Sequence, residues 1–378
     1  MKKVLIATHV SGFVPQFELN NVKTLQELGY EVHYASNFNN VSYGNDNSRL
    51  EGTGIVCHQV DFARSPFDLK KNSKAYRQLK QLLQEHHFEL VHCHTPVGAA
   101  LTRMAANKYR KTGTKVIYTA HGFHFFKGAP LSYWLLFYPV ERYLASYTDV
   151  LVTINEEDYQ RASGFCKNKS TKVKKIPGVG VEIDDAVSVG EKEETRISLG
   201  ISPEKRLLLS VGELNKNKNH ISVIKALRNT DESLCYAICG EGKKRKYLES
   251  KIQQYGLEHR VFLLGYRNDI KQLLRAADAF VLPSLREGLS CSLQEAMTEA
   301  LPVIASDIRG NNELIVPGKG GWLVNPKSIC SIRQALLELE KTDVEAYGRF
   351  NKEIICSYSK AIVTEKMKQI YLSVLKEK

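Results

Sequence analysis

Two glutamates eight positions apart, Glu287 and Glu295, bracket a segment that could bind a phosphorylated ligand. The segment follows the apolar run Ala279–Leu282, contains Gly288, and passes into residues that favour a helix. A helix that starts just after a strand presents unpaired N–H groups and the positive end of its dipole, and phosphate is a natural ligand there. A carboxylate inside the helix could accept hydrogen bonds from ribose hydroxyls. These residues indicate a sugar-nucleotide site, with Glu295 on the ribose and Glu287 near the donor sugar.

The strand, the Gly-Leu-Ser turn and the helix together resemble the E-x7-E segment of a known enzyme family. This family is the retaining glycosyltransferases of the GT-B fold, often called family 4. The resemblance implies that Glu295 contacts the ribose of a UDP-sugar and that Glu287, a catalytic candidate, lies beside the donor sugar. It also implies that amides of the intervening loop meet the sugar and the diphosphate. The loop residues concerned are Gly288, Leu289 and Ser290.

A lysine-containing loop after the apolar run Arg206–Val211 is a second anion-binding candidate. Lysines at the carboxyl end of a strand attract anions by ordinary electrostatics. Lys218 matches the position of the family's diphosphate-binding lysine, and a solvated basic loop is the alternative interpretation. The sequence departs from the family at Glu213, where many members carry an arginine. Lys216 could replace that arginine, or the contact could be missing.

Two more residues are donor-binding candidates. Gly12 follows the first apolar run, Val4–Thr8, and a glycine there would let a phosphate approach closely. No G-x-G-x-x-G motif accompanies it, which argues against a nicotinamide dehydrogenase. Arg267 follows the run Val261–Gly265, in a loop that holds the base in the family, and its guanidinium could stack on uracil.

Three histidines near the ends of apolar runs in the first half are candidate site residues: His121 is a catalytic candidate, and His94 and His124 are acceptor-side candidates. His94 and His121 should project from the carboxyl ends of strands, where doubly wound sheets bind ligands. The His-Gly-Phe-His-Phe segment that contains His121 and His124 resembles members that build capsule, exopolysaccharide or protein-linked glycans on a polyprenyl diphosphate. His92 and His94 share one face of a strand, so a metal site must be considered, but no third ligand with suitable spacing follows.

The resemblance also implies a mechanism. No Asp-x-Asp triplet occurs, so no metal or other cofactor is expected to hold the diphosphate. Lys218, the helix after Glu287 and Gly12 would instead stabilise the departing UDP. We find no carboxylate nucleophile on the acceptor side. We therefore expect front-face attack, assisted by a donor phosphate oxygen, with His121 orienting the acceptor or the reaction centre.

Short Val/Ile/Leu-rich runs alternate with helical patterns along the chain, which is typical of βαβ units and parallel sheets. With 378 residues, two domains are expected. The predicted fold is α/β, of GT-B type, with two Rossmann-like doubly wound parallel-sheet domains facing across a cleft. The boundaries are residues 1–178 for the acceptor domain, 179–360 for the nucleotide-sugar domain and 361–378 for a C-terminal helix that returns to the first domain. An acidic, polar linker is expected up to about Ser202.

Charge and hydropathy suggest where the protein works. Residues 1–180 contain 23 Lys or Arg and 14 Asp or Glu, a net charge of +9 out of +12 for the whole chain. Lys70, Lys74 and Arg77 form a basic stripe on a predicted helix, and Leu131–Val140 is apolar and aromatic but too short to span a bilayer. The basic stripe could also be an ordinary solvated helix face, and the apolar run could be part of an ordinary core helix. We favour contact with an anionic membrane surface, on the cytoplasmic face of the cell membrane, and eight scattered cysteines fit free thiols there.

Three hypotheses follow. The first is a membrane-associated glycosyltransferase that uses a UDP-sugar and a lipid-linked saccharide acceptor. The second is a soluble GT-B glycosyltransferase with a small acceptor. The third is a non-enzymatic nucleic-acid-binding protein that exploits the net charge, although no nucleic-acid-binding motif supports it, and we expect no nucleic-acid partner. The sequence does not identify the sugar, the acceptor or the linkage formed.

Overall fold

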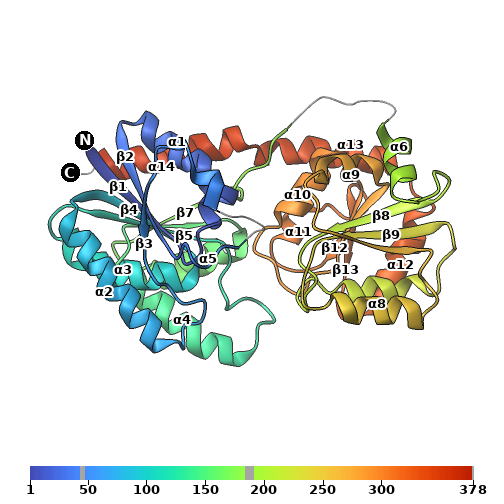
Figure 1. Cartoon of the computed structure of the whole chain (residues 1–378), viewed down its shortest axis with the longest axis horizontal. Coiled ribbons are helices and arrows are strands. Elements are labelled where there is room, and N and C mark those ends of the chain that lie inside the picture. Colours follow the sequence, from blue (N-terminus) through green and yellow to red (C-terminus); the bar gives the residue numbers. More distant parts are fainter. Residues whose placement is uncertain (43–46, 184–190, 377–378) are drawn as a thin grey trace. The chain divides into compact units, whose positions relative to one another are not determined.

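The computed structural model of the chain describes residues 1–42, 47–183 and 191–376. The chain divides into two compact units, each built on one parallel sheet (Figure 1). Unit 1 comprises Met1–Gly180 and Lys360–Lys378, and unit 2 comprises Val181–Ser359. Unit 1 is therefore assembled from two segments that are far apart in the sequence.

Unit 1 contains a seven-stranded sheet with the strand order β3-β2-β1-β4-β5-β6-β7. All adjacent strands are parallel, and the sequence order reverses between β1 and β4. The strands read as apolar runs because most of the sheet is covered on both faces. They are β1 (Lys2–Ala7), β2 (Tyr30–Ser36), β3 (Val56–Gln59), β4 (Phe88–His94), β5 (Lys115–Ala120), β6 (Val150–Thr153) and β7 (Lys172–Lys175).

Helices α1 and α14 cover one face of this sheet, and α2, α3 and α4 cover the other (Figure 1). The predicted apolar face of the C-terminal helix is confirmed, because Val363, Met367, Ile370 and Val374 are all buried. The helices of unit 1 are η1, a π-helical turn (Val14–Glu18), α1 (Leu19–Glu27), the 3₁₀ turn η2 (Asn47–Leu50), α2 (Leu69–Glu85), α3 (Pro96–Arg110), α4 (Leu131–Ala145), α5 (Glu156–Cys166) and α14 (Lys360–Lys376).

Unit 2 contains a six-stranded parallel sheet with the order β10-β9-β8-β11-β12-β13. Its strands are β8 (Arg206–Val211), β9 (Leu234–Cys239), β10 (Val261–Gly265), β11 (Ala279–Leu282), β12 (Val303–Ser306) and β13 (Gly321–Val324). Its helices are α6 (Glu191–Ser198), α7 (His220–Leu227), α8 (Arg245–Gln254), α9 (Ile270–Ala276), α10 (Cys291–Thr298), α11 (Asn311–Leu314), α12 (Ile329–Leu339), α13 (Val344–Ile355) and the 3₁₀ turn η3 (Cys356–Tyr358). Here the order reverses between β8 and β11, as in the Rossmann fold.

Strand β4 and α3 are joined by the single residue Thr95, because Pro96 begins α3 directly. Proline suits the first position of a helix, where its missing N–H is not needed. The acidic linker expected up to Ser202 contains α6, although residues 184–190 of that linker lie outside the described residues. Arg196 anchors α6 by pairing with Asp278 at 2.6 Å and donating to the Ala276 carbonyl.

Within the described part of the chain, no helix has both the length and the apolarity to cross a membrane. The eight cysteines are free; Cys93, Cys166, Cys235 and Cys239 are buried, whereas Cys57, Cys330 and Cys356 are exposed.

Candidate active site residues in the two units

The predicted donor-site residues of unit 2 lie where the strand order reverses. Lys218 belongs to the loop after β8, and Glu287 belongs to the loop after β11. These two strands are hydrogen-bonded neighbours. In open parallel sheets, ligands bind outside the carboxyl ends of the strands at such a reversal. Sequence positions about 70 residues apart are thereby brought to one place.

Lys218 and Glu287 form an ion pair. The Lys218 Nζ atom donates to Glu287 Oε1 at 2.8 Å, and the side chains are only 19% and 14% exposed. The two loops are also joined through the backbone, because the Leu285 N–H donates to the Asn217 carbonyl at 2.8 Å and the Asn217 amide donates to the Arg286 carbonyl. The ammonium group is therefore held in place by a carboxylate within a pair of mutually bonded loops.

The residue after Lys218 holds the backbone in an unusual conformation. Asn219 has φ = 55°, in the left-handed region, directly before α7. Its side-chain amide donates to the carbonyls of Pro283 and Pro326, at 3.1 and 2.9 Å, which fixes it between two other loops. Strained residues of this kind cluster at ligand-binding sites. A Cβ atom on Gly212 would lie 2.8 Å from Lys218 Cε, so a larger side chain there would displace the lysine stem.

The loop between Glu287 and α10 has the predicted form. Ser290 caps α10 by accepting a hydrogen bond from the Leu293 N–H, and Glu295 lies exposed within the helix. The Arg309 guanidinium, from the loop after β12, donates to the Glu287 carbonyl at 3.1 and 3.2 Å. A Cβ on Gly310 would lie 2.1 Å from the Gly288 carbonyl oxygen, so these loops touch through their backbones.

Other donor candidates lie elsewhere. Arg267 follows the edge strand β10 and is engaged with the Asp269 carboxylate through two guanidinium nitrogens. Glu213 and Lys216 are both exposed in the loop after β8. Gly12 is buried in unit 1, where a Cβ would lie 2.2 Å from the Ser42 carbonyl oxygen. Close packing therefore already explains a glycine at this position, and its contact with phosphate stays a prediction.

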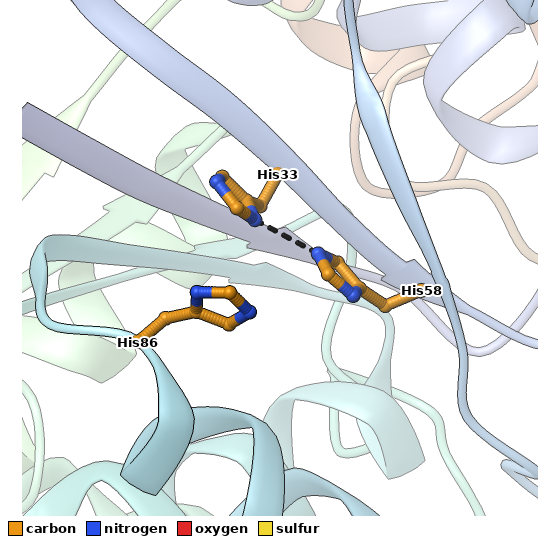
Figure 2. Close-up of side chains that lie close together, drawn as sticks. All are labelled: His33, His58 and His86. Carbon is orange, nitrogen blue, oxygen red and sulfur yellow. Dashed lines mark hydrogen bonds between the residues drawn. The ribbon is translucent and has the colours of Figure 1, made fainter. Parts of the chain in front are cut away.

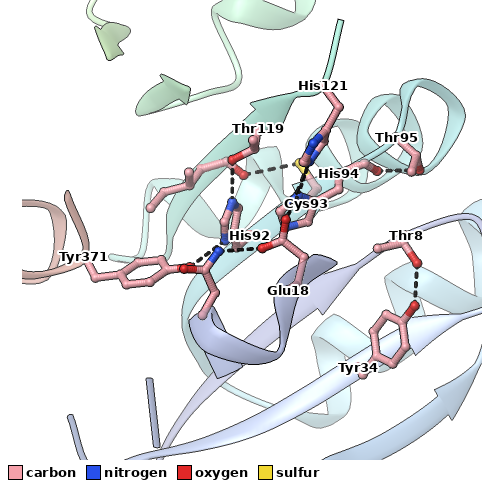
Figure 3. Close-up of polar contacts among 12 residues, drawn as sticks. Thr8, Glu18, Tyr34, His92, Cys93, His94, Thr95, Thr119, His121 and Tyr371 are labelled. Carbon is pink, nitrogen blue, oxygen red and sulfur yellow. Dashed lines mark hydrogen bonds and ion pairs between the residues drawn. The ribbon is translucent and has the colours of Figure 1, made fainter. Parts of the chain in front are cut away.

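Unit 1 gathers a carboxylate and two histidines at the carboxyl edge of its sheet (Figure 3). Glu18 ends the π-helical turn after β1, His94 ends β4, and His121 directly follows β5. The distance between His94 Nδ1 and His121 Nε2 is 3.1 Å, and Glu18 Oε1 lies 3.4 and 3.6 Å from these two atoms. Strand order reverses here as well, between β1 and β4. The cluster thus occupies the ligand-binding edge of a doubly wound sheet.

Burial keeps this cluster uncharged at neutral pH. Loss of solvation raises the pKa of Glu18 from its ordinary value of 4.5 to about 8, opposed in part by a hydrogen bond from Asn21. Burial also lowers the pKa of His121 to about 4, and that of His94 well below 6.5 with help from neighbouring histidines. The cluster is therefore a set of neutral groups, in which His94 and His121 share a hydrogen bond and the Asn21 amide donates to Glu18. π-helical turns are frequent at functional positions of this kind.

A second hydrogen-bonded layer supports the cluster (Figure 3). His92 lies against His94 on the same face of β4, as predicted, with ring centroids 4.1 Å apart. Its Nε2 contacts Thr119 Oγ1 at 2.8 Å, and its Nδ1 contacts the Tyr371 hydroxyl of α14 at 2.9 Å. Both ring nitrogens of His92 are therefore engaged, so its role is structural. By contrast, His94 Nε2 is buried without a hydrogen-bond partner among the described residues.

A small pocket opens beside the cluster, and His121, whose side chain is 22% exposed, is part of its wall. The other lining residues are Phe17, Glu18, Asn20, Asn21, Thr119, Ile176, Val179, Val363 and Thr364. His124, the other acceptor-side candidate, lies outside this set and stacks on Phe137 of α4 with ring centroids 4.5 Å apart. The structure thus brings together two of the three predicted histidines.

Glu18 is the main residue that the sequence did not reveal. A glutamate within a predicted helix is normally solvated, and nothing in the segment from Val14 to Leu19 marks one for burial. Spacing along the chain revealed no third possible metal ligand beside the histidines. In the structure, Glu18 lies beside His94 and His121, although it precedes His94 by about 75 residues. A buried acidic residue can be located from a folded structure but not from periodicity.

Comparisons with known proteins agree with this architecture. A family model described as "Glycosyl transferases group 1" matches residues 191–355, and one described as "Glycosyl transferase 4-like" matches residues 3–155. The chain is 36% identical over 377 residues to "Putative glycosyltransferase EpsD" of Bacillus subtilis (strain 168), covering 98% of this chain and 96% of that protein. This chain belongs to the family 4 glycosyltransferases of the GT-B fold.

A second relative of this glycosyltransferase is the "UDP-Gal:alpha-D-GlcNAc-diphosphoundecaprenol alpha-1,3-galactosyltransferase" of Escherichia coli. It is 30% identical over 350 residues, covering 89% of this chain and 87% of that protein. Among solved structures, Anabaena Alr3699/HepE in complex with UDP-glucose superposes with a TM-score of 0.81 at 19% identity, covering 99% and 100% of the two chains. The predictions of the fold and of a transferase enzyme are confirmed, which excludes the non-enzymatic hypothesis.

Proposed function

We propose that this glycosyltransferase moves a hexose or an N-acetylhexosamine from a UDP-sugar, with retention, to a polyprenyl-diphosphate-linked saccharide in bacterial polysaccharide biosynthesis. The observation that carries the proposal is the Lys218–Glu287 pair at the strand reversal of unit 2, beside the N-terminus of α10. A cation and helix amides at such an edge suit a diphosphate. The E. coli relative, whose name contains a UDP-sugar and a diphosphoundecaprenol acceptor, supports the choice of substrates.

The donor would lie against unit 2 as follows. Lys218 would transfer its ammonium contact from Glu287 to the diphosphate, and the freed carboxylate would accept from hydroxyls of the donor sugar. Amides of Gly288, Leu289 and Ser290 would meet the sugar and the phosphates, and Glu295 would accept from the ribose. Arg267 would hold the base. Gly12 would let the departing phosphate approach unit 1 closely, and no metal would be needed.

The reaction would proceed on one face of the sugar. The bond from the anomeric carbon to the UDP oxygen breaks as the acceptor oxygen bonds to the same face, and the acceptor proton passes to a phosphate oxygen of the departing UDP. Lys218 and the α10 amides would stabilise the charge that develops on UDP. His121 would orient the acceptor hydroxyl, with neutral Glu18 and His94 fixing its ring and His124 further along the acceptor.

The lipid-linked acceptor would be met at a membrane surface on the cytoplasmic side. Helix α4 packs Trp134, Phe137 and Tyr138 against the core of unit 1. Its Leu131 and Leu135 are 73% and 71% exposed, and Leu136, Val140 and Tyr143 are exposed as well. Helix α2 covers the same face of the sheet as α4 (Figure 1), and its basic residues Lys70 and Arg77 are exposed. An apolar strip near basic residues suits the interface of an anionic membrane.

The decisive experiment is a donor panel. UDP-hexoses and UDP-N-acetylhexosamines would be offered with a synthetic polyprenyl-diphosphate sugar, in buffer containing EDTA, and the anomeric configuration of the product would be read by NMR. One UDP-sugar should give an α-linked product on the lipid. Inversion, a requirement for added Mg²⁺ or Mn²⁺, or no transfer from any UDP-sugar would contradict the proposal.

A small soluble acceptor is the competing function. It predicts that a water-soluble saccharide is used as well as the lipid-linked one and that untagged protein stays in the supernatant after membrane sedimentation. Our proposal predicts instead that the lipid-linked saccharide is the better acceptor and that untagged protein sediments with membranes.

A further inference from the structure

Three histidines of unit 1 converge away from the candidate active site (Figure 2). His33 lies on β2, His58 on the edge strand β3, and His86 at the end of α2. Each offers one ring nitrogen, and these atoms all lie within 4.8 Å of one another. His33 Nδ1 and His58 Nε2 are 2.8 Å apart, and the rings of His33 and His86 have centroids 5.1 Å apart.

A carboxylate orients the most buried of the three. Glu31 Oε1 lies 2.6 Å from His33 Nε2, so that nitrogen carries the proton and donates, and Nδ1 faces His58 with its lone pair. A carboxylate behind a histidine is the usual support for a metal-binding imidazole, because it fixes the tautomer and the ring orientation. The His33 side chain is 2% exposed, so the arrangement is held by the sheet.

A lysine side chain lies beside the cluster. Lys3 Nζ is 3.4 Å from His86 Nδ1 and 3.8 Å from Glu31 Oε1. The lysine therefore occupies one nitrogen of His86 and is partly neutralised by the glutamate. Nε2 of His86 is left to serve as the ligand atom.

We propose that His33, His58 and His86 bind one divalent transition-metal ion of the Zn²⁺ class, with His33 supported by Glu31. Three imidazoles suit Zn²⁺, Ni²⁺ or Cu²⁺ and not the oxygen-seeking Mg²⁺ or Ca²⁺. Tetrahedral bonds of about 2.0–2.1 Å put ligand nitrogens roughly 3.3 Å apart, and the three nitrogens already lie within 4.8 Å of one another. Water fills the fourth position.

The bound ion would stabilise the exposed edge strand of the sheet. Strand β3 is an edge strand of four residues, and three of those residues are exposed. It pairs with one neighbour, β2, through His33–Val56 to Ser36–Gln59. A metal bound to all three histidines ties β3 and the end of α2 to β2, and so raises the stability of unit 1 without taking part in sugar transfer.

The test uses the full-length protein without a histidine tag, stripped with a chelator, and titrated with ZnCl₂ by calorimetry. We expect one Zn²⁺ per chain, and a rise of roughly 5–10 °C in the melting temperature at 100-fold excess over Kd. His58→Gln and His86→Gln should each weaken Zn²⁺ binding by at least about tenfold. His87→Gln, which changes the exposed neighbouring histidine, should bind as wild type, and transferase activity at 20 °C should stay unchanged in all three variants.

X-ray absorption at the zinc edge should show three imidazole nitrogens at about 2.0–2.1 Å. Three results would overturn the proposal. The first is a Kd weaker than about 0.1 mM, which at ordinary metal levels leaves the site empty. The second is equal binding by wild type, His58→Gln and His86→Gln. The third is binding that His121→Gln abolishes and His58→Gln preserves, which would assign the ion to the Glu18–His94–His121 cluster instead.

Discussion

Lys218 pairs with Glu287 at 2.8 Å, and this pairing determines how the two residues would act. The pair is largely shielded from water, so separating it without a substitute anion would leave an uncompensated charge. In the proposed function, the donor diphosphate supplies that anion. The pair would then keep the lysine positioned and release it to a ligand of greater negative charge.

Replacing Lys218 by alanine should reduce kcat by about 10²–10³-fold, because one preorganised contact to the departing diphosphate is lost. UDP affinity, measured by calorimetry, should fall as well. Lys216→Ala is the matched control, since Lys216 lies in the same loop but is exposed. If both variants lost activity equally, the loop would act through its general charge, and if only Lys216→Ala lost activity, that lysine would be the diphosphate ligand.

Glu18 should give unit 1 a distinctive pH dependence. The folded protein keeps the carboxyl protonated up to about pH 8, whereas the unfolded chain releases the proton near pH 4.5. Between these values the folded state binds more protons, so the contribution of Glu18 to the free energy of unfolding falls as pH rises. From pH 6.5 to 8 the wild type should lose roughly 2 kcal/mol relative to Glu18→Gln.

Urea unfolding of both proteins at several pH values measures this difference. The window above pH 6.5 is chosen because the lowered pKa of His121, about 4, acts in the opposite direction, removing stability as pH falls below the ordinary histidine range. Parallel pH profiles for wild type and Glu18→Gln would mean that the carboxyl is already ionised in the fold.

At the scale of elements, α4 has two different sides. Trp134, Phe137 and Tyr138 pack against the core of unit 1, and this was one of the two interpretations of the sequence. The opposite side exposes Leu131, Leu135 and Val140, which fits the other interpretation. The apolar run therefore serves packing on one side and leaves an apolar strip on the other.

The double variant Leu131→Ser, Leu135→Ser should bind vesicles of anionic phospholipid about tenfold or more weakly than wild type, because two exposed leucines no longer enter the interface. Sedimentation with vesicles measures it. Ile197→Ser is a matched control, since Ile197 is 65% exposed on α6 of unit 2. Unchanged binding of the double variant would leave electrostatic attraction by basic helices as the sole basis for membrane contact.

A buried ion pair ties α4 to α3. Arg103 is fully buried and pairs with Glu141 at 2.8 Å, and its guanidinium lies 4.0 Å from the ring centre of Tyr118 on β5. Removing one partner of a buried pair leaves an uncompensated charge. The helix that bears the exposed leucines is therefore fixed to the sheet by charge as well as by aromatic packing.

Glu141→Ala should destabilise unit 1 by about 3–5 kcal/mol in urea unfolding. Lys2→Ala, which removes the exposed pair with Glu89, should cost less than about 1 kcal/mol. Equal effects of the two changes would show that Arg103 finds another partner when Glu141 is absent.

At the scale of the whole molecule, the sequence predicted the alternation of strands and helices, the two-unit plan and the C-terminal helix. Long apolar strands and one-sided helices are local patterns, so they can be read without the fold. The sequence indicated Lys218 and Glu287 in two separate motifs, but it did not show that the two residues form an ion pair. Glu18 and Tyr371 were not foreseen, because their burial depends on strand order and on chain segments hundreds of residues apart. The three-histidine cluster was missed for the same reason.

Unit 1 begins the chain and is also completed by its last helix, since Tyr371 of α14 supplies the hydroxyl that bonds to His92 on β4. During synthesis, a nascent polypeptide that has emerged from the ribosome only as far as Ser359 contains every residue of unit 2 but lacks part of unit 1. Unit 1 can therefore complete its packing only after unit 2 has been translated, because the contacts of α14 with its sheet come last. The residues of the second unit are all available before those of the first.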